Sequence, residues 1–352
     1  MTRHKLGSVR FFIICLLSIN LGMALPLIGT VASSLTLTMG AEWLQLSDWS
    51  LQQRLALFEA FDSRGFPYRI KSNSDIHKIA KDVSQDFLTS GKILPADYQQ
   101  IASHLFVSCT RDSIAVSNLN KWYIGLPLFF THKSVNDVNR SAIKLRHSFN
   151  FVWSRNEKSA STGQPLTDLQ WESDPGQELL GSLVSPSEAS LKFVLARQLL
   201  SIERQALDAH ITSVAIGSLP MFIYGLTRTF KKALKAQHIP KGLSVLLGCA
   251  STFIVSFGAL TAFDFRRCQI ERSLDRAAAS VSRDYAQGGV TYYNQLLTQN
   301  RALRQLQIDS GDWKASQKMS PIGDPVTFIR QKNLPISSRR DVCVKVADSF
   351  KN

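Results

Sequence analysis

The residue types that most often do chemistry in proteins do not form a known catalytic pattern in this sequence. HExxH, GxSxG and P-loop motifs are absent, and no GxGxxG follows a predicted strand. The seven histidines are isolated, so no pair has the spacing of metal ligands. No CxxC or CxxxC pair occurs, which argues against a disulfide framework, a thiolate metal site and a copper-delivery protein. The five cysteines are Cys15, Cys109, Cys249, Cys268 and Cys343.

One segment nevertheless resembles a metal-binding helix. FVLARQLLSIE, residues 193–203, is similar to the helix that carries HExxH in HtpX-type membrane zincins, with Arg197, Gln198 and Ser201 at the matching positions. In those enzymes a membrane hairpin follows this helix, and a glutamate ligand in an ExxxD pattern comes next. Here Glu271 and Asp275 have that spacing after an apolar hairpin. This order of helix, hairpin and ExxxD segment favours a degenerate zincin-like scaffold. The alternative is that ExxxD is a chance match on an amphipathic helix.

Zinc chemistry is not expected at these positions. A catalytic site needs three protein ligands and an activated water. Arg197 carries a permanent positive charge, and the amide of Gln198 cannot act as a base near neutrality. We therefore expect no metal, no cofactor and no enzymatic activity. If the two helices face one another as in the zincins, Arg197 is instead expected to pair with Glu271 or Asp275, and so to tie together the segments that flank the hairpin.

Composition indicates a membrane protein with most of its mass outside the bilayer. Charged residues make up 19% of the 352 residues, below the soluble average of about 25%. Three windows, 11–36, 211–227 and 243–263, contain no charged residue. The formal net charge is +14, but the basic residues are dispersed and no zinc-finger spacing is present, so nucleic-acid binding is not favoured.

The chain is therefore predicted to be a mainly α membrane protein with a small β component. The N-terminal apolar run is too long for a secretory signal, so we expect an uncleaved anchor. A buried soluble hairpin is the alternative for the two later windows. The predicted parts are a basic N-terminus (1–10), transmembrane helix 1 (11–33), the first part of a soluble domain (37–208), transmembrane helix 2 (210–228), a basic loop (229–241), transmembrane helix 3 (242–264) and the second part of the soluble domain (268–352).

Local patterns predict the elements of the soluble parts. Helices are expected at 51–61 and 96–106, a buried strand that Pro127 breaks at 122–130, and a loop at 155–184. Ser185 is expected to cap a helix that runs to about residue 208. A further helix from residue 269 is expected to stop at Gly288-Gly289, with another helix after it.

Small residues recur in the predicted spans. Ser244, Gly248, Thr252 and Ser256 repeat every four residues in the third span, and Ser213, Gly217 and Gly225 form a similar set in the second. Small side chains allow close approach of helices in lipid, so the first set is a candidate packing face. The alternative is that small residues are simply common in spans.

Several segments closely resemble the transmembrane protein 177 family. They are LKFVLAR (Leu191–Arg197), LDRAAASVSRDYAQGGVTYYNQLLTQNRALRQL (Leu274–Leu306) and LPISSRRDV (Leu334–Val342), with the hairpin between the first two. The likeness is specific over about residues 185–345 and weak over 37–184, where only WYIGLP is similar.

The resemblance implies a non-enzymatic assembly factor of the mitochondrial inner membrane. Its implied partners are newly synthesised cytochrome c oxidase subunit II, the membrane chaperone that stabilises that subunit, and the inner-membrane copper chaperones. The alternatives are a membrane metalloprotease-like protein with an unusual or vestigial site, and a transporter. The basic flanks of the first and second spans predict that 37–208 and 268–352 both face the intermembrane space.

Overall fold

The computed structural model covers all 352 residues, and the structure describes residues 70, 74–89, 101, 103–108, 112–117, 122–140, 143–146, 150–153, 166–202, 204, 225, 241–312, 315–327 and 330–351. The predicted segments 1–10, 11–33 and 51–61 lie outside the described residues, as does 229–241 except for Lys241. So does 210–228, except for Gly225. Nothing in the structure therefore tests the predicted first and second spans.

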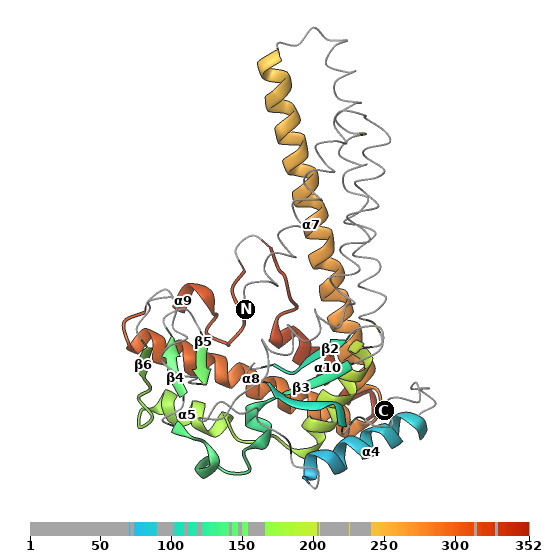
Figure 1. The fold of residues 1–352 in the computed structure, drawn as a ribbon, viewed down its shortest axis with the longest axis vertical. Helices are drawn as coiled ribbons and strands as arrows, with labels where there is room; N and C mark the ends of the chain where they lie inside the picture. Colours follow the sequence, from blue (N-terminus) through green and yellow to red (C-terminus); the bar gives the residue numbers. More distant parts are fainter. Residues whose placement is uncertain are drawn as a thin grey trace, which may run out of the picture. The chain divides into compact units, whose positions relative to one another are not determined.

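The described residues are mainly helical with a small β component, as the sequence predicts (Figure 1). The helices are α4 (Asp75–Thr89), α5 (Asp174–Ser182), a helix over residues 188–202, α7 (Lys241–Ala279), α8 (Arg283–Asp309), α9 (Ala315–Lys318) and α10 (Ile336–Ser349). Two short 3-10 turns follow β3, at Leu128–Thr131 and Val135–Asp137.

The strands form two three-stranded sheets. In the first, β3 (Trp122–Pro127) lies between β1 (Leu105–Ser108), to which it is parallel, and β2 (Ile114–Ser117), to which it is antiparallel. In the second, β4 (Ile143–Arg146) lies between β5 (Asn150–Trp153) and β6 (Leu166–Asp168), antiparallel to both. β3 ends at Pro127, so the buried strand predicted at 122–130 is confirmed for 122–127, whereas 128–130 lie in the 3-10 turn that follows.

Contacts divide the chain into two units, and α7 runs from one into the other. One unit contains Met1–Gln52, Asn118–Asn120 and Arg204–Ala262, and the second contains Gln53–Ser117, Lys121–Glu203 and Phe263–Asn352. The main core lies in the second unit, where α8 packs against α10 and α5. Phe193, Tyr285, Tyr292 and Tyr293 are almost completely buried there. Burial of such side chains contributes roughly 1.5–3 kcal/mol each, so this core dominates the stability of the unit.

The glycine pair at 288–289 does not end a helix, which corrects the sequence prediction. α7 ends at Ala279, and Ser282 caps α8 by accepting a hydrogen bond from the Tyr285 amide. The pair lies inside α8. A Cβ on Gly288 would come within 2.1 Å of the Ala189 carbonyl oxygen, so the glycine allows close packing against the 188–202 helix.

Three other local predictions were wrong. Leu105 and Phe106, expected at the end of a helix, begin β1, because their side chains pack in the first sheet. The expected loop at 155–184 contains β6 and α5, whose first turn is capped by the side chain of Ser173. The helix expected to begin at Ser185 begins at residue 188, because the Ser187 hydroxyl accepts the Ser190 amide.

The first half of α7 contains the predicted third span. Several large apolar side chains are exposed along it, including Leu246 (66%), Phe253 (71%) and Ile254 (67%). Where the structure describes both backbone and side chains, no helix is long and apolar enough to cross a membrane. The side chains of the small-residue set Ser244, Gly248, Thr252 and Ser256 lie outside the described part, so the packing face stays a prediction.

Candidate functional site

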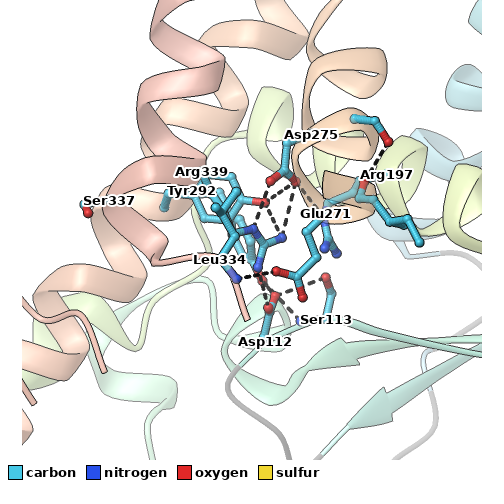
Figure 2. A network of polar contacts seen from close by, with 12 residues as sticks. Asp112, Ser113, Arg197, Glu271, Asp275, Tyr292, Leu334, Ser337 and Arg339 are labelled. Atoms are coloured by element: carbon cyan, nitrogen blue, oxygen red, sulfur yellow. Dashed lines mark hydrogen bonds and ion pairs between the residues drawn. The ribbon is translucent and has the colours of Figure 1, made fainter. Parts of the chain in front are cut away.

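A buried carboxylate on the second half of α7 binds two arginines and a tyrosine from other elements of the second unit. Asp275 is completely buried. Its Oδ1 accepts hydrogen bonds from Arg197 Nε at 2.7 Å and from the Tyr293 hydroxyl at 2.6 Å, while Oδ2 accepts from Arg339 Nε at 2.9 Å. The two guanidinium groups come from different elements, the 188–202 helix and α10 (Figure 2). One carboxylate thus joins four helices.

The neighbouring part of this cluster reaches the loop before β2. Arg339 Nη1 donates to Asp112 at 3.2 Å, and the Tyr292 hydroxyl donates to the same carboxylate at 2.5 Å. The Ser113 amide donates to the Tyr292 hydroxyl at 3.1 Å, as Figure 2 shows. Gln198 fixes Ser113 from another side by donating to its carbonyl at 2.8 Å and to its hydroxyl at 2.6 Å.

Helical spacing explains how α7 presents Asp275. Asp264, Cys268, Glu271 and Asp275 follow one another at intervals of four, three and four residues, so they lie on one face of the helix. That face contacts residues 330–339. The contacts are Arg330 to Asp264, Cys268 to the Gln331 carbonyl, the Leu334 amide to Glu271, and Arg339 to Asp275. The chain from residue 330 to 339 therefore runs alongside α7 in the same direction.

The charges in the cluster balance. Arg197 and Arg339 supply two cations, and Asp112 and Asp275 supply two carboxylates. Burial alone would raise the pKa of Asp275, but the charges of Arg339 and Arg197 outweigh burial, and the pKa lies below its ordinary value. Burial raises the pKa of Tyr293, so its hydroxyl stays protonated and donates. Asp275 is therefore an ionised acceptor near neutral pH.

The structure brings together some of the residues that the sequence singled out. Arg197 pairs with Asp275, so the expected ion pair is confirmed with the second of its two candidate partners. Glu271 instead accepts the Leu334 amide at 2.7 Å and lies 3.8 Å from Arg267. Gln198 is buried against Ser113, and Ser201 lies half-buried one turn further along the helix.

The arrangement is suited to holding segments together. Both oxygens of Asp275 accept hydrogen bonds from cations, so this carboxylate has little capacity to bind a metal ion or to transfer a proton. Across the parts of the chain that the structure describes, no group of three or more His, Cys, Asp or Glu side chains could hold a metal ion. What the cluster does provide is a set of charge-assisted hydrogen bonds between α7, α8, α10, the 188–202 helix and the loop before β2.

Sequence reasoning missed half of this cluster. Arg339, Asp112 and the hydroxyls of Tyr292 and Tyr293 were not expected to join Arg197 and Asp275 in one cluster. A signal was present, because Arg339 lies in LPISSRRDV and both tyrosines lie in Leu274–Leu306, the segments that carry the family resemblance. A further clue is that Arg339 lies three residues after Ile336 and four before Cys343, so helical spacing places it on the same face as these two residues.

The fold and the cluster define a mainly helical protein whose polar centre is a set of paired charges. The chain belongs to the transmembrane protein 177 family, whose model matches residues 60–343. Transmembrane protein 177 from Danio rerio is 29% identical over 181 residues, which cover 49% of this chain and 54% of the relative. The proteins of that name from Xenopus laevis and Homo sapiens are each 30% identical, with the same two coverages.

The chain spans about half the length of the curated relatives that it matches. No solved structure matches it.

Proposed function

We propose that this chain is a membrane-anchored, non-enzymatic assembly factor that stabilises newly synthesised cytochrome c oxidase subunit II in the mitochondrial inner membrane. It would act beside the small membrane chaperone of that subunit and near the inner-membrane copper chaperones. The observation that carries the proposal is membership of the transmembrane protein 177 family over residues 60–343. The partners and the location come from the family resemblance.

Membrane attachment is supported by the distribution of charge. The windows 11–36, 211–227 and 243–263 have no charged residue, and the second and third are separated by a basic segment. A window of about 20 uncharged, mostly apolar residues is long enough to cross the hydrocarbon core as a helix. The exposed apolar side chains of α7, such as Phe253 and Ile254, fit contact with lipid. The proposed topology places 37–208 and 268–352 in the intermembrane space.

The absence of an enzymatic step is supported by the ion cluster. The residues at the zincin-like positions are engaged in structural contacts, Arg197 with Asp275 and Gln198 with Ser113. A general acid or base needs a pKa near the working pH, whereas the pKa of Asp275 is lowered and its oxygens are occupied. This chemistry fits a scaffold that holds another protein.

Co-purification tests the proposal directly. Mitochondria carrying the tagged chain would be labelled during organellar translation, and the tagged protein recovered in mild detergent. Newly made subunit II should be recovered in excess over the other labelled subunits, together with its chaperone. Equal recovery of all labelled subunits, or none, would show that the proposed partner is wrong.

Topology needs a separate measurement. Protease added to mitoplasts should digest both 37–208 and 268–352, and protection of the C-terminal part until the inner membrane is solubilised would contradict the assignment.

Digestion of a peptide library, abolished by a chelator, would favour the metalloprotease alternative.

A further inference from the structure

The end of the apolar stretch on α7 combines exposed aromatic and basic side chains. Phe263 and Phe265 are 36% and 66% exposed. Arg266 and Arg267 follow directly in the sequence. Aromatic rings followed by arginines are typical of the zone where a helix leaves the hydrocarbon core and meets lipid headgroups.

A second segment adds charge to the same place. Arg330 makes two hydrogen bonds to Asp264, from Nε at 2.6 Å and from Nη2 at 3.0 Å. Cys268 contacts the Gln331 carbonyl, and Glu271 accepts the Leu334 amide. These contacts fix residues 330–334 against α7, so Lys332 is held close enough to Asp264 for its charge to act on that carboxylate, although the two are far apart in sequence.

The charged side chains around Asp264 have a positive sum. Arg330 and Asp264 neutralise one another. The ion pair between Arg267 and Glu271 is long, at 3.8 Å, and the Arg267 side chain is 64% exposed, so this pair is weak. Lys332 is exposed, and its charge and those of Arg267 and Arg330 all act on the Asp264 carboxylate. Among these described residues, three basic side chains at 267, 330 and 332 lie near two acidic ones at 264 and 271, so one positive charge is left over.

We propose that Arg267 and Lys332, beside the exposed rings of Phe263 and Phe265, form a binding surface for the phosphate groups of anionic phospholipids. A guanidinium and an ammonium provide donors for phosphate oxygens, and the rings provide apolar contact for the acyl-chain boundary. A soluble acidic peptide would match the charges but would leave the two phenylalanines exposed to water. The inference rests on the proposed membrane insertion of residues 242–264.

The full chain, purified in a neutral detergent with an equimolar mixture of phosphatidylcholine and phosphatidylglycerol, provides the test. After detergent exchange, the ratio of the two lipids retained per chain would be measured by mass spectrometry. The wild-type chain should retain phosphatidylglycerol preferentially. Each cation removed in Arg267→Gln/Lys332→Gln should lower that preference by about fivefold. Arg267→Lys should keep most of it, because the charge is retained.

A matched control separates this surface from general charge. Arg276 on α7 and Lys345 on α10 are exposed, and Arg276→Gln/Lys345→Gln removes the same number of charges. This variant should retain the lipids in the wild-type ratio. Loss of preference in the control, or no loss in the Arg267/Lys332 variant, would overturn the proposal.

Two further measurements keep the outcome unambiguous. High ionic strength should reduce the preference of the wild-type chain, because exposed charges are screened, and an unchanged ratio would contradict the inference even if the double variant fails to fold. Alkaline carbonate extraction of native membranes reports insertion itself. A chain released by carbonate would refute the proposed membrane anchoring, whereas a chain that resists release but shows no preference for phosphatidylglycerol would refute only the lipid surface.

Discussion

The ion cluster makes a quantitative prediction about Arg197 and Asp275. Replacing Arg197 by Met removes one cation but leaves Asp275 paired with Arg339 and Tyr293. Removing one partner of a buried pair costs about 3–5 kcal/mol, so this variant should lie near the lower end of that range. Replacing Asp275 by Asn leaves two buried guanidinium groups with Asp112 as their remaining carboxylate partner, and should lie near the upper end.

The double variant distinguishes charge balance from simple loss of contacts. Arg197→Met/Asp275→Asn leaves Arg339 paired with Asp112, so the remaining cluster is again neutral. Its free energy of unfolding should therefore fall by clearly less than the sum of the single changes, with a coupling of about 2–3 kcal/mol, the upper part of the range for residues in contact. The assay is equilibrium urea unfolding of the full chain in detergent, followed by tyrosine fluorescence and circular dichroism.

An exposed ion pair provides the matched control. Lys133 and Asp75 are also joined at 2.7 Å, but their side chains are 82% and 74% exposed. Lys133→Ala should leave the free energy of unfolding unchanged within error, because water and salt screen an exposed pair. Additive single changes at 197 and 275, or an equal loss in Lys133→Ala, would refute the view that burial sets the strength of the cluster.

Four other outcomes are expected. Because the folded pKa of Asp275 is lowered, its contribution to stability is present above the unfolded value of about 4 and is lost as pH falls toward the folded pKa; Asp275→Asn should therefore flatten the acid limb of a stability profile, and an unchanged slope would contradict this. Gly288→Ala should cost about 1–3 kcal/mol in urea unfolding because its Cβ would meet the Ala189 carbonyl, whereas Gly181→Ala, with no atom within 4 Å of its Cβ, should be tolerated. Gly248→Leu should reduce partner recovery or protein level, and wild-type levels with intact complexes would count against the packing face. Elemental analysis of the purified protein should find no stoichiometric zinc, and zinc that a chelator removes would overturn the proposed lack of zincin chemistry.

The local sequence pattern predicted those elements whose conformation depends mainly on residues close to one another in the sequence. The aromatic run before Pro127 predicted β3, because proline cannot donate within a sheet and so marks where pairing ends. The spacing from Ile270 to Leu274 and beyond predicted the amphipathic second half of α7. Gly288 was misread because a glycine pair resembles a helix stop, and only the packing of Ala189 against it shows why it lies inside a helix.

The sequence by itself determined that Arg197 could not serve as a zinc ligand, because a guanidinium keeps its positive charge. It predicted a carboxylate partner only for the case in which the two helices that flank the hairpin face one another. The order of the helix, the hairpin and the 271–275 segment left two carboxylates, Glu271 and Asp275, as candidate partners of Arg197. The choice of Asp275 over Glu271, and the recruitment of Arg339 and Asp112, depend on contacts between residues 64 to 227 positions apart. Only the tertiary structure decides such contacts, because helical periodicity fixes which face a side chain occupies and says nothing about which distant segment packs against that face.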